Sequence, residues 1–149
     1  MLSETSSLQL KIALSEKERQ EVFSLLTQQK LPVTDIKEDT LLYLLLNGDK
    51  VTGTAGLDIF DDCALLRSVS VTEDARGKGY GKILNEQIEK YAKESGISCM
   101  YLITHTAKDF FDRQGYCVID RATAPDPIKQ TDQFTGLCPS SAVVMKKTI

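Results

Sequence analysis

One run of residues has the composition of a turn that binds phosphate. The run lies between an apolar, strand-like segment, 64–71, and an amphipathic, helix-like segment, 82–94, and it reads Arg76-Gly77-Lys78-Gly79-Tyr80-Gly81. Glycine tolerates positive φ, so several backbone N–H groups of such a turn can point at one ligand. The N-terminal end of the following helix adds partial positive charge, and the nearby basic side chains add full charges. The pattern predicts a site for a phosphate or pyrophosphate.

Two common phosphate-binding loops do not fit this run. A P-loop requires Gly-x-x-x-x-Gly-Lys followed by Ser or Thr, and a dinucleotide-binding turn requires Gly-x-Gly-x-x-Gly after the first strand of a βαβ unit. Here the spacing is Gly-x-Gly-x-Gly, and it follows what looks like an antiparallel meander. A solvated glycine-rich turn without a ligand is the alternative to a phosphate site of another kind.

Two further residues could take part in chemistry. Arg67 lies within an apolar strand, and the period of two predicts that it shares a face with Val69 and Val71. A buried guanidinium needs a carboxylate, which is either a substrate's or a structural Asp or Glu of the chain. His105, the only histidine, follows an expected strand. Its imidazole suits deprotonation of an ammonium group near neutral pH, and a solvent-exposed loop histidine is the alternative.

The cysteines do not indicate a metal site. Their spacing contains no Cys-x-x-Cys pair, and a single histidine cannot complete a zinc site. We expect no bound metal and interpret the four thiols as buried side chains, with a catalytic Cys–His pair involving His105 as the alternative. They are Cys63, Cys99, Cys117 and Cys138.

The composition is typical of a globular protein. With 149 residues, 42% of them hydrophobic, the chain has the length of one domain, expected over 1–149. The net charge of −3 argues against general nucleic-acid binding. The N-terminal segment lacks the features of a signal peptide, and no apolar run is long enough to cross a membrane. We therefore expect a cytoplasmic protein without nucleic-acid or membrane partners.

Periodicity and turn signals give the order of the elements. Ser15 and Glu18 form an expected capping box at the start of the first helix. The segments 63–71 and 99–103 flank the glycine-rich turn and its helix, so these two strands should be parallel. We expect a mixed, mostly antiparallel sheet with helices on both faces, an α/β (α+β) arrangement. Strands are expected at 8–14, 41–47, 50–60, 63–71, 99–103, 116–120 and 142–145, and helices at 16–29, 82–94, 107–114 and 128–134.

The run Arg-x-x-Gly-x-Gly, at 76–81, resembles the acetyl-CoA pyrophosphate loop of the GNAT superfamily of N-acetyltransferases. The segment 107–116 resembles the second signature of that family, and the order of the elements agrees over the whole chain. Three shorter segments are similar to a narrower group of small enzymes, associated with arsenic resistance and related to amino-acid N-acetyltransferases. These segments are 65–69, Phe110-Phe111 and 137–143.

The resemblance implies the GNAT fold, with a sheet of six to seven strands in which the parallel pair splays apart. It also implies acetyl transfer from acetyl-CoA to the amine of a small molecule, such as an amino acid or an amino-acid-like toxin. An N–H group near Val69 would polarise the thioester carbonyl. The residues expected to hold acetyl-CoA are Val69, Val71, Arg76, Gly77, Lys78, Gly79, Tyr80, Gly81 and Lys82.

The resemblance places the acceptor near the same strand. The expected catalytic residues are Arg67, Val69 and His105, and the expected acceptor contacts are Arg67, Ser68, His105, Ser140 and Ser141. The connector 31–40 is the other expected wall of the acceptor pocket, with acidic side chains that could attract an amine. A homodimer is left open, because an edge strand near the C-terminus often pairs in dimers of this family.

Two positions depart from the family pattern. Phe111 stands where the family often has a tyrosine that protonates the leaving thiolate, and Thr104 stands where it often has an asparagine. Either His105, Tyr116 or a water supplies the proton, or CoA leaves as the thiolate. The departure keeps a non-catalytic acyl-CoA sensor as the alternative function, and peptide or protein N-acetylation is a third.

Overall fold

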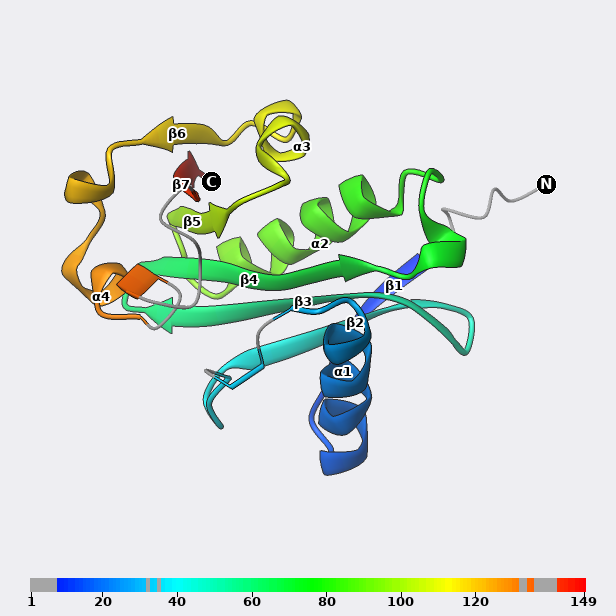
Figure 1. Ribbon diagram of the computed structural model, residues 1–149. Helices are drawn as coiled ribbons and strands as arrows, with labels where there is room; N and C mark the ends of the chain where they lie inside the picture. The colour runs from blue at the N-terminus through cyan, green and yellow to red at the C-terminus, as the bar shows by residue number, and fades with distance from the viewer. Residues whose placement is uncertain (1–7, 32, 35, 132–133, 136–141) are drawn as a thin grey trace.

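The computed structural model describes residues 8–31, 33–34, 36–131, 134–135 and 142–149 (Figure 1). The strands and helices follow one another in the order that the sequence predicts. The elements are β1 (Leu8–Ile12), α1 (Glu16–Gln28), β2 (Leu41–Asn47), β3 (Lys50–Phe60), β4 (Cys63–Val71), α2 (Tyr80–Glu94), β5 (Cys99–Thr104), α3 (Lys108–Arg113), β6 (Cys117–Ile119), α4 (Asp126–Lys129) and β7 (Val143–Thr148).

The strands form one seven-stranded sheet in the order β1-β2-β3-β4-β5-β7-β6. Every pair is antiparallel except β4–β5, which the crossover through α2 makes parallel. The predicted fold class is therefore confirmed, including the parallel pair.

The helices cover the two faces of the sheet. α2 and α3 pack on one face, with Leu84, Ile88 and Phe111 in the same core cluster as Leu66 of β4. α1 and α4 lie on the opposite face, which Figure 1 shows with α1 in front. Strand residues alternate between the two layers, as the period of two requires. The sheet thus separates a face covered by α2 and α3 from a face covered by α1 and α4.

The local signals that begin and end the helices act as the sequence predicts. Ser15 Oγ accepts a hydrogen bond from Glu18 N, and Glu18 Oε1 accepts one from Ser15 N, so the capping box is formed. Gly96, with φ of 91°, follows the end of α2. Because none of the helices in the described ranges is both long and apolar enough, none qualifies as a membrane span.

Some predicted boundaries are wrong. The first strand ends at Ile12, and Leu14 is 77% exposed because it precedes the cap of α1. α2 begins at Tyr80, so part of the predicted turn is already helical. The last strand runs to Thr148, beyond the predicted end, because β7 pairs with β5 and β6 on its two sides. α4 begins and ends earlier than the segment 128–134 in which a helix was expected.

Candidate active site

A β-bulge interrupts β4 at the centre of the sheet. Gly56 of β3 pairs with Arg67 and Thr54 pairs with Ser70, so two residues of β4, Ser68 and Val69, stand opposite one residue of β3. Ser68 has a φ of 58°, in the left-handed region that few residues other than glycine adopt. Such a bulge bends the strand and changes the direction of the side chains that follow it.

The bulge overturns the prediction that Arg67 shares a face with Val69 and Val71. The two valines pack against the cluster that contains α2 and α3. Arg67 pairs with Gly56, whose other neighbour, Leu42, belongs to the cluster on the α1 side. The extra residue in β4 breaks the alternation, so Arg67 faces α1 and the valines face α2.

A gap opens between β4 and β5 next to the bulge. The register of this parallel pair runs from Cys63↔Cys99 to Leu66↔Leu102, whereas β4 continues to Val71 and β5 to Thr104. Among the described strands, none pairs with β4 on the β5 side from Arg67 to Val71. This edge of β4 can therefore bond an extended ligand through its backbone groups, as an added strand would.

The glycine-rich turn lies between β4 and the N-terminus of α2. Gly77 and Gly79 both have a φ of 80°, and a Cβ added at either would meet nothing within 4 Å. Gly79 is the N-cap of α2, and no side chain caps the helix there. The first N–H groups of a helix have no partner within it. The turn is therefore open around Gly77 and Gly79, next to the helix end that carries these donors.

The charges around the turn favour an anion. The first turn of α2 contains no acidic residue, and Lys78 and Lys82 are exposed on the turn and the helix. Arg76 holds the turn in place, because its guanidinium donates to Val71 O at 3.2 Å and to Gln29 Oε1. Tyr80 Oη accepts a hydrogen bond from Asn47 Nδ2 at 3.3 Å. Open glycines, helix N–H groups and positive charge fit a pyrophosphate.

Gly81 has a different task from the other glycines. A Cβ on Gly81 would lie 3.2 Å from Phe110 Cζ, so the missing side chain lets α3 pack closely on the first turn of α2. Thr104 Oγ1 accepts a hydrogen bond from Ala107 N at 3.0 Å and shapes the turn before α3. These contacts fix the start of α3 against α2 and the end of β5.

In the short helix α3, a phenylalanine, Phe111, stands where the resemblance implies a tyrosine that donates a proton. Phe111 is buried and packs edge-on against both Phe110 and Tyr116. Tyr116 is 2% exposed, and its hydroxyl has no hydrogen-bond partner among the residues that the structure describes. Burial, and then the negative charge of Glu89, raises the pKa of Tyr116, which makes its hydroxyl a poor acid.

The remaining predicted side chains lie in several places. His105 is exposed in the bend after β5, at the end of the strand that lines the gap. Ser140, Ser141 and Cys138 lie outside the described residues. The prediction of buried thiols holds for Cys63, whereas Cys99 is half-buried and Cys117 is exposed. No cluster of three potential metal-binding side chains occurs in the ranges described above.

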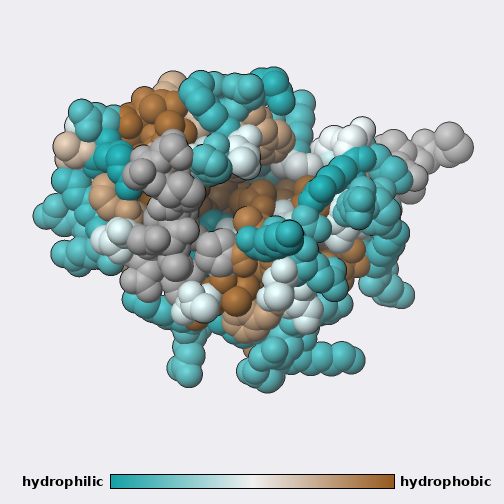
Figure 2. Space-filling view, in the orientation of Figure 1, coloured by the Kyte–Doolittle hydropathy of each residue, from teal (hydrophilic) through white to brown (hydrophobic). Residues whose placement is uncertain are grey.

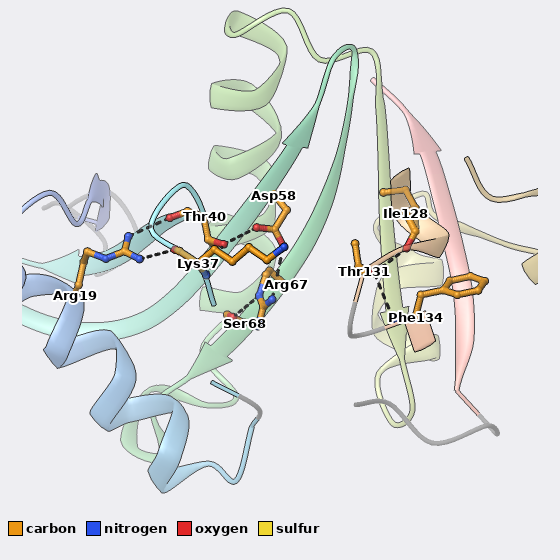
Figure 3. A network of polar contacts seen from close by, with 9 residues as sticks. All are labelled: Arg19, Lys37, Thr40, Asp58, Arg67, Ser68, Ile128, Thr131 and Phe134. Carbon is orange, nitrogen blue, oxygen red and sulfur yellow. Dashed lines mark hydrogen bonds and ion pairs between the residues drawn. The ribbon is translucent and has the colours of Figure 1, made fainter. Parts of the chain in front are cut away.

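Arg67 has the carboxylate partner that its burial requires. Its side chain is 1% exposed, and Nη1 lies 3.6 Å from Oδ2 of Asp58 on β3. The other oxygen of Asp58 accepts a hydrogen bond from Thr40 Oγ1 at 2.5 Å, and Arg67 Nε donates to Ser68 Oγ at 3.1 Å. Figure 3 shows this chain of contacts, which joins the connector before β2 to the bulge of β4.

α1 holds the far end of the same network. Arg19 donates to Thr40 O at 3.0 Å and to Lys37 O at 2.9 Å, so the connector is fixed against α1 (Figure 3). Beside it is a pocket of about 490 Å³ that carries side chains of both charges. Its lining residues are Lys37, Asp39, Asp58, Ile59, Phe60, Pro127, Gln130 and Thr131. In the same orientation as Figure 1, Figure 2 shows a separate apolar hollow near the middle of the view, bordered in part by hydrophilic side chains.

Sequence reasoning missed the polar residues of β3 that face this site. Thr54 and Asp58 stand in a strand whose alternation is only partly regular, and neither belongs to a motif. The one available signal was the requirement that a buried arginine find a carboxylate, which predicted a partner without identifying it. The expected pocket wall at 31–40 does contribute lining residues, Lys37 and Asp39.

Comparison with known proteins gives one family. Residues 8–116 match the model of the acetyltransferase (GNAT) family. An uncharacterized N-acetyltransferase of Chlorobaculum tepidum is 35% identical over 65 residues, which are 44% of this chain and 41% of the relative. An amino-acid acetyltransferase of Pasteurella multocida is 31% identical over 91 residues, which are 59% of this chain and 21% of the relative. The chain thus spans less than half the length of either curated relative.

Solved structures share the fold at low sequence identity. N-acetylglutamate synthase from Neisseria gonorrhoeae, complexed with coenzyme A and L-arginine, superposes with a TM-score of 0.78 at 16% identity, over 95% of this chain and 33% of that one. An acetyltransferase from Streptococcus agalactiae superposes with a TM-score of 0.69 at 19% identity, over 96% of this chain and 99% of that one.

Proposed function

The chain belongs to the acetyltransferase (GNAT) family, and from that membership we propose that it transfers the acetyl group of acetyl-CoA to the amino group of a small molecule. The observation that carries this proposal is the open glycine-rich turn at the N-terminus of α2, directly beside the unpaired stretch of β4. The pyrophosphate of acetyl-CoA would bind at the turn, and its extended pantetheine arm would lie along the unpaired stretch of β4. The whole chain, 1–149, would act as one catalytic domain.

The donor side uses backbone groups for binding. N–H groups from Gly77 to Lys82 would hold the pyrophosphate, and Lys78 and Lys82 would supply charge. Backbone groups of Val69 and Val71 would bond the pantetheine arm along the free edge of β4. Acetyl-CoA supplies an activated acyl group. The N–H of Val69 would stabilise the negative charge that develops on the carbonyl oxygen as the amine attacks.

The acceptor side lies on the opposite face of β4. The pocket beside Asp58 offers carboxylates and the ammonium of Lys37, so it suits an acceptor that carries both charges, such as an amino acid. The named relatives, an amino-acid acetyltransferase and N-acetylglutamate synthase, support this class of acceptor. Because the guanidinium of Arg67 is buried, we propose that Arg67 acts on the acceptor through Asp58, which is 16% exposed, in place of direct contact with the substrate.

Proton transfer does not need the missing tyrosine. His105 lies at the end of β5, where an imidazole could take the proton of the acceptor ammonium directly or through water. The thiol of CoA is acidic enough for CoA to leave as the thiolate, without a proton from a protein acid. Phe111 nevertheless favours one rival function, an acyl-CoA sensor that binds without turnover.

Substitution of Gly79 tests the donor site. Gly79→Ala places a Cβ where φ is positive and on the open side of the turn, so we expect the Kd for acetyl-CoA to rise about tenfold or more. Gly48→Ala is the matched control, because Gly48 also has positive φ and open space, in the turn between β2 and β3. Calorimetric titration measures both. Equal affinities of the two variants would exclude the turn as the pyrophosphate site.

A further inference from the structure

We propose that Thr54 is a positioning residue, whose hydroxyl fixes the peptide between Ser68 and Val69 and so aims the Val69 N–H group into the gap between β4 and β5. The inference rests on the proposed function for its kinetic consequence, because it gives the donor of the thioester site its direction. Thr54 itself touches neither acetyl-CoA nor the acceptor.

The contact that carries the proposal lies in the bulge. Thr54 Oγ1 donates a hydrogen bond to Ser68 O at 2.8 Å, and Thr54 is 1% exposed. Ser68 and Val69 have no one-to-one partners in the register with β3. A side-chain hydroxyl of β3 thus donates to this carbonyl inside the bulge. Water cannot easily replace a donor that is buried this deeply.

Because the peptide bond is planar, the contact that holds the Ser68 carbonyl also fixes the direction of the Val69 N–H group. The chain has no cis peptide among the described residues, so the C=O of Ser68 and the N–H of Val69 point in opposite directions within one plane. Because Thr54 on β3 holds the carbonyl, the N–H points away from β3. On that side β4 has passed the end of its register with β5, at Leu66↔Leu102. The N–H is therefore directed toward the gap.

A second anchor shows why the bulge needs to be held. Ser68 has positive φ, a conformation that a serine adopts only when its surroundings enforce it. Arg67 Nε donates to Ser68 Oγ at 3.1 Å, and Gly56 leaves room for Arg67, because a Cβ there would lie 3.3 Å from Arg67 Cγ. Thr54 fixes the carbonyl and Arg67 fixes the side chain. A hydrogen-bond donor held in this way needs no rearrangement as charge develops.

Thr52 provides a matched control in the same strand. Its hydroxyl donates to Leu45 O at 3.0 Å, it is 3% exposed, and it stands in the bulge between β3 and β2. Thr52→Val and Thr54→Val remove the same kind of bond from equally buried sites. We expect both to lower the Tm by a similar amount, about 3 °C. Only the bond of Thr54 controls a peptide at the gap.

Steady-state kinetics separates an effect on the direction of the Val69 N–H group from an effect on the stability of the fold. We expect Thr54→Val to lower kcat about tenfold or more, with the KM for acetyl-CoA changed less than about threefold, since one oxyanion donor loses its alignment. Thr54→Ser restores the hydroxyl and should recover kcat, while Thr52→Val should keep kcat within about twofold of wild type. Equal kcat in Thr54→Val and Thr52→Val would overturn the proposal. If Thr54→Val does not fold, Thr54→Ala takes its place.

A binding measurement separates this inference from the proposed function. In ¹⁵N-labelled wild-type protein, we expect acetyl-CoA to shift the amide resonance of Val69, and Thr54→Val to reduce that shift while Thr52→Val retains it. This readout does not require turnover. A wild type that shows the shift but acetylates no amine would refute the proposed function and leave the aiming role intact. A Val69 shift that is unchanged in Thr54→Val would refute the aiming role alone.

Discussion

Neighbouring residues of β4 face opposite sides of the sheet. Val69 faces α2 and presents its backbone at the gap, whereas Arg67, shortly before it in the sequence, faces α1 and pairs with Asp58. Ser68 joins the two sides, because its hydroxyl accepts a hydrogen bond from Arg67 and its carbonyl accepts one from Thr54. Contacts within the sheet thus connect the proposed acceptor pocket with the proposed donor site.

Asp58 is the residue through which the acceptor pocket can be tested. Asp58→Asn keeps an acceptor for Thr40 but removes the counter-charge of Arg67, which should cost about 3 kcal/mol of unfolding free energy. We expect kcat/KM for an amino-acid acceptor to fall about tenfold or more, with the Kd for acetyl-CoA unchanged. Asp49→Asn, in the exposed turn between β2 and β3, removes the same charge as a control. An Asp58→Asn variant with wild-type acceptor kinetics would contradict the assignment of the pocket.

A substitution of Tyr116 tests whether this residue protonates the leaving thiolate. Its hydroxyl is buried without a partner in the part of the chain that the structure describes. Tyr116→Phe removes that unsatisfied group, so we expect unfolding in denaturant to show stability that is unchanged or higher by up to about 1 kcal/mol. The kcat should also stay within about twofold, because a hydroxyl with a raised pKa gives up its proton poorly. A large loss of kcat would instead identify Tyr116 as the proton donor.

Among the elements, α1 depends on its cap for stability at neutral pH. The side chain of Lys11 lies 2.7 Å from the Glu18 carboxylate, which also accepts hydrogen bonds from Ser15. The bond from Lys11, followed by those from Ser15, lowers the pKa of Glu18 to about 2, from its ordinary value of 4.5. A depressed pKa in the folded state stabilises the fold above pH 4.5, and this contribution is lost as the pH falls toward about 2.

The pH dependence of one variant checks this cap. Glu18→Gln keeps a hydrogen-bonding side chain at the third position of α1, and we expect it to lower the Tm at pH 7. The difference from wild type should shrink between pH 4.5 and pH 2, where Glu18 takes up its proton. Glu16→Gln, in the same first turn, is the control for loss of charge. A difference that does not vary with pH would show that the ion pair contributes nothing.

For the molecule as a whole, the sequence predicted more of the fold than of the site. The hairpin 41–60 was located from Gly48 and the apolar runs on either side of it, because turn chemistry and periodicity are local signals. The glycine-rich turn was located for the same reason. The bulge was not predicted, since alternation assumes an unbroken ladder, and the contacts that hold Ser68 come from another strand. That single extra residue moved Arg67 to the opposite face from Val69.

The network around Arg67 could not be predicted from the sequence either, because its members are far apart along the chain. Arg19, Thr40 and Asp58 belong to three segments that only the folded sheet brings together. Burial of an arginine predicts that a partner exists, whereas the register of β3 against β4 decides which carboxylate it is. The family follows from local motifs, whereas the proposed acceptor pocket depends on these tertiary contacts.

The most direct test of the central claim is the release of free CoA thiol by the full chain. The protein is incubated with acetyl-CoA and, one at a time, with a panel of amino acids and simple amines, and the products are identified by mass. The account predicts thiol release that depends on the acceptor, with an N-acetylated amino acid formed in equal amount. Acetyl-CoA binding without thiol release on any amine would contradict it and would favour a sensor.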